Sequence, residues 1–89
     1  MGAELNEETK SLIRYSLNME KNILNLSLLK WKTKLKEFED ENNMSTKDFL
    51  DKFNKGKLGD DKIWFDWLFA YKAYINIENK LRLIKNINL

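Results

Sequence analysis

Carboxylates are the side chains of this chain whose type and spacing come nearest to a catalytic or metal-binding pattern. They cluster at residues 7–8, 39–41 and 60–61. A pair of carboxylates can carry general acid–base catalysis, and a tight loop that gathers several oxygens can hold a hard cation. Two clusters fall at expected helix starts, where acids compensate the helix dipole, and the third lies at a solvated helix end. We therefore expect structural roles for them, with catalysis or metal binding as the less favoured alternative.

The composition removes most other chemistry. Histidine and cysteine are both absent, so the chain lacks the commonest general base, the commonest metal ligand and any thiol nucleophile or disulfide. The sequence also contains no glycine pattern of the kind that cradles phosphate groups. These features predict a protein that is not an enzyme and that has no cofactor and no metal.

The run KWKTKLK, residues 30–36, is the basic stretch with an interleaved aromatic ring. Nucleic-acid binding requires cations gathered on one surface, whereas helical spacing scatters these lysines over opposite sides of the helix. The net charge of +2 is also small. A recognition helix that began at residue 60 would bring two acids toward the phosphates. We therefore disfavour nucleic acid as a partner.

Two features bear on location. No apolar run approaches the roughly 20 residues that a membrane span requires. Residues 1–4 lack a basic segment followed by an apolar one, which predicts no secretory signal. Together with the absence of cysteine, these features favour a cytoplasmic protein with no membrane partner.

The longest expected helix covers residues 6–42. Asn6 is a suitable N-cap, and the two acids that follow it suit the positive end of a helix dipole. At 100° per residue, one apolar stripe within about 80° runs along the whole segment and predicts a seam that packs against another helix. Its members are Ile13, Leu17, Leu24, Leu28, Trp31, Leu35 and Phe38.

A second apolar stripe occupies only the N-terminal half of this helix, well round the cylinder from the seam. A helix with two apolar stripes needs two neighbours. A β-hairpin is the alternative for this region, because residues 13–19 and 24–28 also alternate with period two about a turn at MEKN. We favour the helix because the seam persists from residue 13 to residue 38. The second stripe consists of Leu12, Tyr15, Met19, Ile23 and Leu26.

Two further helices are expected after this one. Ser45 is an N-cap with Asp48 as its capping-box partner, and Gly56 supplies the left-handed position that ends this short helix. The third helix is expected to run from Asp60 to about residue 85. Phe65 and Phe69 point away from its seam and lack a partner in a two-layer monomer. That seam is formed by Ile63, Trp67, Ala70, Tyr74, Ile77, Leu81 and Ile84.

These elements predict a single all-α domain over residues 1–89, a helical hairpin of two long helices joined through a short capped helix. The apolar surface left outside the seam predicts an interaction site, because contiguous exposed apolar surface marks such sites and interface cores are rich in aromatic and Met side chains. We expect a protein partner or a second copy of the chain to bind there. The alternative is that the long helices bend round each other and bury this surface as core. The expected interface residues are Leu12, Tyr15, Met19, Ile23, Leu26, Phe65 and Phe69.

Residues 35–67 resemble a group of small proteins from archaea and cyanobacteria. In that group a helix ending in a Phe-Glu pair leads into a short cap and then into a run of spaced aromatic, glycine and aspartate residues. Asn43 stands where the group usually has glycine, and asparagine also adopts the left-handed conformation. The matching residues are Phe38, Glu39, Met44, Ser45, Phe49, Phe53, Gly56, Leu58, Asp60, Asp61, Phe65 and Trp67.

Members of this group look like the antitoxin half of two-gene toxin–antitoxin modules. The resemblance implies a non-catalytic protein that binds a small toxin, such as a ribonuclease, and neutralises it by occlusion. The shared motif consists of caps and packing residues, and it leaves out the N-terminal half-helix. A homo-oligomeric helical protein without a toxin, most simply a homodimer, is the second candidate.

Overall fold

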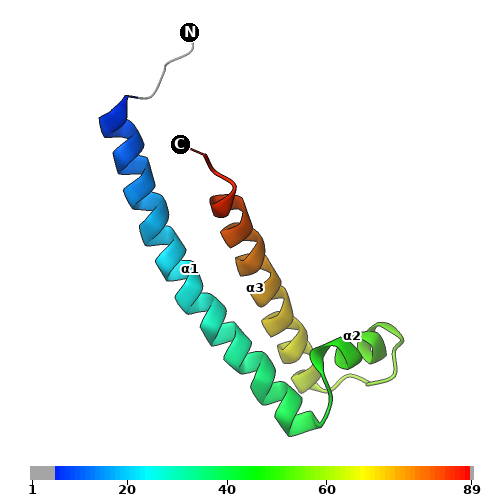
Figure 1. The fold of residues 1–89 in the computed structure, drawn as a ribbon. Helices are drawn as coiled ribbons and strands as arrows, with labels where there is room; N and C mark the ends of the chain where they lie inside the picture. The colour runs from blue at the N-terminus through cyan, green and yellow to red at the C-terminus, as the bar shows by residue number, and fades with distance from the viewer. Residues whose placement is uncertain (1–5, 89) are drawn as a thin grey trace.

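The computed structural model describes residues 6–88, and this part of the chain is built from three helices (Figure 1). They are α1 (Glu7–Asn42), α2 (Thr46–Asn54) and α3 (Lys62–Lys85). No strand occurs within residues 6–88, so the all-α class expected from the sequence is confirmed. Residues 1–5, which carry the expectation about a secretory signal, lie outside the described part. Within that part, no helix combines the length and the apolar character that a bilayer crossing requires.

The β-hairpin alternative for the N-terminal region is wrong, because α1 is continuous from Glu7 to Asn42. The period-two alternation extends over only a few residues on either side of the supposed turn. The seam spacing instead extends along the whole segment and gives the helix a continuous face to bury against α3. Helix formation is cooperative and depends on such a packed face, so the longer pattern decides the structure.

α1 and α3 lie side by side with opposite chain directions, and α2 lies where the chain turns between them (Figure 1). The seam residues of α1 face α3, and the seam residues of α3 face α1. All of them are buried or half-buried. Leu24 of α1 and Ile77 of α3 are buried at mid-seam, with exposed fractions of 6% and 8%. The seam therefore uses the apolar residues that the spacing selected.

The best-buried part of the protein is an aromatic core at the bend. Phe49 of α2 and Trp67 of α3 are both 0% exposed, and their rings stack with centroids 4.2 Å apart and planes 3° apart. The indole N–H of Trp67 donates a hydrogen bond of 3.1 Å to the hydroxyl of Thr46. Phe38 of α1 stacks on Trp67 at 5.6 Å. All three helices thus meet at one tryptophan ring, which fixes α2 against the two long helices.

The cap of α2 differs in part from the expected capping box. The Ser45 hydroxyl accepts a hydrogen bond of 3.1 Å from the Asp48 backbone N–H, as an N-cap does. Within residues 6–88, the Asp48 carboxylate makes no return hydrogen bond to the backbone of Ser45. The Glu39 carboxylate of α1 instead accepts a hydrogen bond of 2.8 Å from the Thr46 N–H. The acidic cluster at residues 39–41 therefore serves a structural purpose through Glu39.

The expected start of the third helix at Asp60 is wrong by one to two residues. Asp61 is the N-cap of α3, and its carboxylate accepts a hydrogen bond of 3.4 Å from the Ile63 N–H. Both aspartates have cap chemistry, so the choice between them depends on the path of the preceding loop. Gly56 and Gly59 in that loop take the left-handed φ values of 69° and 81°, which favour glycine. Gly56 directly follows the C-cap Lys55, which is the left-handed position assigned to it from the sequence.

Candidate protein-docking surfaces

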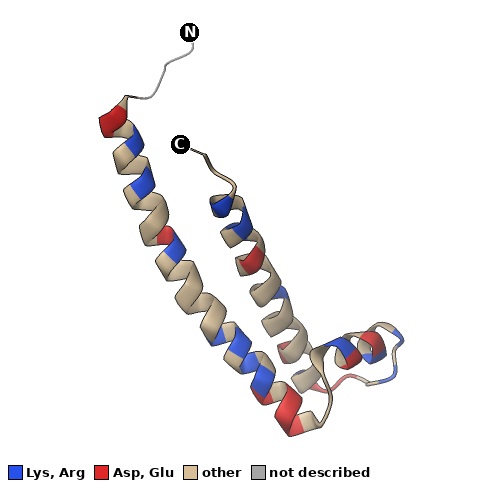
Figure 2. Cartoon of the chain, in the orientation of Figure 1, with Lys and Arg blue, Asp and Glu red and all other residues tan. Residues whose placement is uncertain are grey.

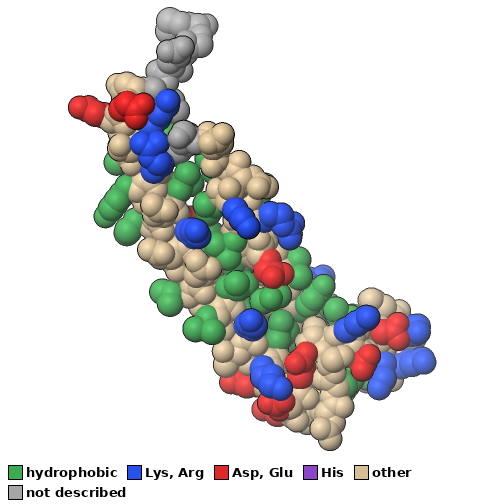
Figure 3. All heavy atoms as spheres, in the orientation of Figure 1, with side chains coloured by type: hydrophobic (Ala, Val, Ile, Leu, Met, Phe, Trp, Pro, Cys, Tyr) green, Lys and Arg blue, Asp and Glu red, His purple; other side chains and the backbone are tan. Residues whose placement is uncertain are grey.

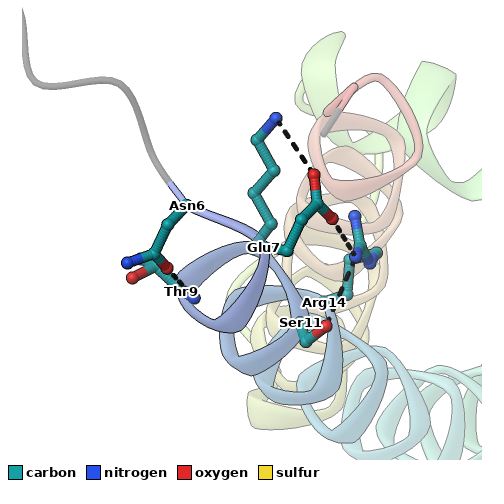
Figure 4. A network of polar contacts seen from close by, with 6 residues as sticks. Asn6, Glu7, Thr9, Ser11 and Arg14 are labelled. Carbon is teal, nitrogen blue, oxygen red and sulfur yellow. Dashed lines mark hydrogen bonds and ion pairs between the residues drawn. The ribbon is translucent and has the colours of Figure 1, made fainter.

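The acidic residues do not converge on a reactive centre. Within residues 6–88, no group of three or more His, Cys, Asp or Glu side chains is placed to hold a metal ion. Acids gather at the first turn and in the last turns of α1, with cations between them (Figure 2). At the first turn, Glu7 forms ion pairs with Lys10 at 3.9 Å and Arg14 at 3.8 Å, while Asn6 caps the helix by accepting from the Thr9 N–H (Figure 4). These contacts stabilise a helix start.

The second apolar stripe of α1 lies on the outside of the molecule. Its members are between 49% and 71% exposed. At 100° per residue the stripe is centred about 140° from the seam, so the side chains cannot reach α3. Figure 3 shows apolar side chains standing out from the outer edge of α1 in its N-terminal half. We call this surface the N-terminal stripe. It is formed by Leu12, Tyr15, Met19, Ile23 and Leu26.

Phe65 and Phe69 form a second apolar surface, the bend patch, on the first turns of α3. The expectation that they lack any partner within the chain needs correction, because each ring packs edge-on against one other ring. Phe65 meets Phe53 of α2 at 5.6 Å and 88°, and Phe69 meets Trp31 of α1 at 5.6 Å and 70°. Edge-on contact covers only one side of a ring. The two rings therefore remain 50% and 64% exposed.

The structure does not bring the seven expected interface residues together into one surface. Phe69 lies beside Trp31, in the C-terminal half of α1, whereas the N-terminal stripe spans residues 12–26. Because α1 and α3 are antiparallel, the start of α3 lies near the bend and the stripe lies toward the free ends (Figure 1). The candidate site is thus two separate surfaces.

Three exposed apolar residues were missed by the sequence reasoning. Leu29 is 62% exposed and follows Leu26 by three residues, so it extends the N-terminal stripe by about one turn. Leu83 is 67% exposed and Ile87 is 47% exposed. Eighteen residues make five helical turns, so Leu83 falls on the same face of α3 as Phe65. That spacing was the available signal for Leu83, whereas Ile87 lies beyond the end of α3.

The lysines of the basic run do not form one cationic surface. Lys36 lies 3.0 Å from the Asp40 carboxylate, and this hydrogen bond raises the pKa of Lys36 above its ordinary value. Lys34 pairs with Glu37 at 3.8 Å. Lys30 lies over the Trp31 ring, 5.0 Å from its centroid. Since these partners lie on different sides of α1, the run supplies no continuous track for a phosphate backbone.

An open groove of about 580 Å³ lies between α1 and α3 near the bend, with Lys32 and Lys36 on one wall and Tyr71 and Tyr74 on the other. The Tyr74 hydroxyl donates a hydrogen bond of 3.0 Å to the Glu78 carboxylate. This hydrogen bond, together with burial and the charge of Glu78, raises the pKa of Tyr74 above its ordinary value. The groove holds no reactive pair of groups, and its polar contacts stabilise α3.

The raised pKa of Tyr74 predicts a pH dependence of stability. Because the folded state holds the phenol proton to higher pH than the unfolded state, this stabilisation is present below about pH 10 and is lost as the pH rises through the folded pKa. Tyr74→Phe should therefore flatten the decline in the free energy of unfolding above about pH 10. Denaturant titrations at stepped pH, carried out on Tyr74→Phe and on the unaltered chain, measure this slope. An unchanged alkaline slope in Tyr74→Phe would contradict the assignment.

Comparison with known proteins adds no further assignment. No family model, no curated protein and no solved structure matches the chain.

Proposed function

We propose that this protein is a non-catalytic, helical protein-binding module that docks its partner through apolar side chains outside its seam. The arrangement on which the proposal rests is a helical hairpin, with two long helices joined through the capped helix α2. The candidate docking surfaces are the N-terminal stripe and the bend patch. Their aromatic and Met content is typical of interface cores.

The observation that supports this function best is the contrast between what is buried and what is exposed. Within residues 6–88 the buried apolar residues are few, namely Leu24, Phe49, Trp67, Ala70 and Ile77, and of these the large side chains of Phe49 and Trp67 are fully buried. Ten large apolar residues of the described chain are instead largely exposed. Single exposed apolar residues scattered over a surface need no explanation. Here they form two contiguous patches instead, one along a face of α1 and one made by the two phenylalanines at the bend, and contiguous exposed apolar surface marks an interaction site.

The resemblance of residues 35–67 to antitoxins supports a narrower form of this proposal. In that form the partner is a small toxin, such as a ribonuclease, and the chain neutralises it by covering its active site. The elongated shape suits occlusion, since the molecule measures 56 × 26 × 17 Å and offers long faces to a partner. No residue of this chain needs to perform chemistry in such a complex.

A homo-oligomeric helical protein is the second candidate function. It is supported by the spacing of the N-terminal stripe, whose apolar residues lie four and seven positions on either side of Met19. It is compatible with docking of a different protein at the bend patch.

Co-expression tests the proposed function directly. The product of the adjoining open reading frame is produced alone and together with this chain. We expect growth arrest in the first case, rescue in the second, and a purified complex of the two proteins. A harmless neighbour that forms no complex with this chain would contradict the antitoxin form of the proposal.

The bend patch should be a centre of this binding. Replacing Phe65 and Phe69 by serine is expected to weaken the complex by at least about hundredfold, because exposed aromatic residues at an interface centre carry much of the binding energy. The fold should persist, since each ring makes one edge-on contact. Calorimetric titration measures the affinity, and Lys80→Ser on the exposed side of α3 is the matched control. Equal affinity of the double variant and the control would show that the partner binds elsewhere.

A further inference from the structure

The N-terminal stripe is symmetric about its central residue. From Met19, the apolar residues lie four positions away at Tyr15 and Ile23 and seven positions away at Leu12 and Leu26. A two-fold interface requires that residue i contacts residue j while j contacts i, and a stripe with mirrored spacing meets this requirement when two copies run antiparallel. The spacing therefore fits a second copy of the same helix.

Charged residues continue the same symmetry at both ends of the stripe. Glu8 lies eleven positions before Met19, and Lys30 lies eleven positions after it. Both project along the line of the stripe at 100° per residue. An antiparallel pair centred on Met19 places Glu8 beside Lys30 of the second copy, twice by symmetry. A parallel pair would place like charges beside one another.

Neither charge is paired with an opposite charge among the described residues. Within residues 6–88, Glu8 and Lys30 form no ion pair, although Lys30 lies over the neighbouring Trp31 ring at 5.0 Å. The adjacent acid behaves differently, because Glu7 contacts Lys10 and Arg14 (Figure 4). Lys34 and Glu37, the next charges along this side of α1, pair with each other at 3.8 Å. Within the part of the chain that the structure describes, the two charges that an antiparallel copy would neutralise thus have no ion-pair partner.

The stripe offers a continuous apolar contact surface, because its five large side chains are between 49% and 71% exposed. The repeat along the stripe is eleven residues for three turns, so the exposed row stays on one face of a nearly straight helix.

We propose that the N-terminal stripe binds a second copy of this chain, forming an antiparallel α1–α1 dimer with its two-fold axis at Met19. This inference rests on the proposed function insofar as the stripe is a docking surface, and it names the occupant of that surface. In the dimer, Leu12 packs against Leu26 and Tyr15 packs against Ile23 of the second copy. The bend patch stays exposed at both ends of the assembly, where it remains open to a different protein.

Charge exchange tests the register of the dimer. Light scattering on the purified full chain at about 100 µM, a concentration at which a standard-sized interface is occupied, should give the mass of a dimer. Glu8→Lys alone and Lys30→Glu alone should each raise the dissociation constant about tenfold, because every altered pair becomes a like-charge contact. The double variant Glu8→Lys/Lys30→Glu should return the dissociation constant close to its original value.

Substitution at the two-fold axis tests the centre of the interface. Met19→Glu should raise the dissociation constant at least about hundredfold, because two carboxylates would meet at the axis. Leu83→Glu also replaces an exposed apolar residue by a carboxylate, but on α3, and it should leave the dissociation constant unchanged.

Cross-linking tests the direction of the two helices. The chain contains no cysteine, so single cysteines can be placed without background. A short bismaleimide should join Leu12→Cys to Leu26→Cys in a mixture of the two variants, and it should not join Leu12→Cys to itself.

A monomer at the tested concentration, a dimer insensitive to Met19→Glu, or self-linking of Leu12→Cys would overturn the proposal. The first of these results, obtained together with binding of the adjoining gene product, would leave the protein-binding function standing. Loss of that binding with an intact antiparallel dimer would contradict only the antitoxin form of the function.

Discussion

Trp67→Ala is expected to lower the free energy of unfolding by about 3–5 kcal/mol, the usual range for truncating a buried aromatic residue. Trp67 is fully buried, stacks on Phe49 at 4.2 Å and on Phe38 at 5.6 Å, and hydrogen-bonds Thr46. A domain of this length has about 5–13 kcal/mol in total. The loss is therefore a large share of the stability, and it removes the ring on which all three helices meet. Chemical denaturation followed by circular dichroism measures the change.

Two further variants test the hydrogen bond of Trp67 and the position of the core separately. Thr46→Val leaves the buried indole N–H without an acceptor and should cost about 1–3 kcal/mol. Trp64→Ala makes the same truncation as Trp67→Ala at a half-buried ring and should cost clearly less. Equal losses for Trp64→Ala and Trp67→Ala would show that the core is not centred on Trp67.

Leu24→Ala is expected to cost about 2–4 kcal/mol and to act mainly at the end of the hairpin away from the bend. Leu24 is the buried apolar residue of α1, and the rest of its seam is half-buried. No aromatic stack supports that part of the seam within the described residues, since the ring contacts involve Trp31 and residues that follow it. Amide hydrogen exchange should therefore accelerate in the N-terminal half of α1 and the last turns of α3. Exchange at the bend should change less.

The matched control is Leu83→Ala, which makes the same change at a residue that is 67% exposed. It should alter stability by no more than about 0.5 kcal/mol. If Leu24→Ala instead accelerates exchange uniformly along the chain, the hairpin unfolds as one unit and the assignment of a weaker free end is wrong.

The helix boundaries were accessible from the sequence because capping chemistry is local. Asn6, Ser45 and Gly56 act on backbone groups within a few residues of themselves, so their types reveal their roles. The seam was accessible for a related reason, since its period is a property of a single helix. The division of α1 into a seam and an outer stripe follows from the same period.

Contacts between helices could not be read in this way. The hydrogen bond from Thr46 to Glu39 depends on the geometry of the turn between α1 and α2. The choice of Asp61 over Asp60 depends on the loop that Gly59 shapes. The ring partners of Phe65 and Phe69 depend on where α2 and α1 lie beside α3, which no single-helix pattern contains. The separation of the expected interface into two surfaces follows from the same missing information.

The order in which the chain folds follows from the position of the aromatic core. Thr46 and Trp67, which meet there, are 21 residues apart, whereas Leu17 and Ile84, which line one groove near the free ends, are more than sixty apart. Closing the shorter loop costs less entropy, so we expect the bend to form first. The contacts between α1 and α3 should then form progressively toward the free ends of the hairpin. High φ-values at Phe49 and low ones at Leu17 would report this order. The N-terminal stripe is synthesised before α3, yet the end of α1 that carries it is the last part of this helix to pack against α3.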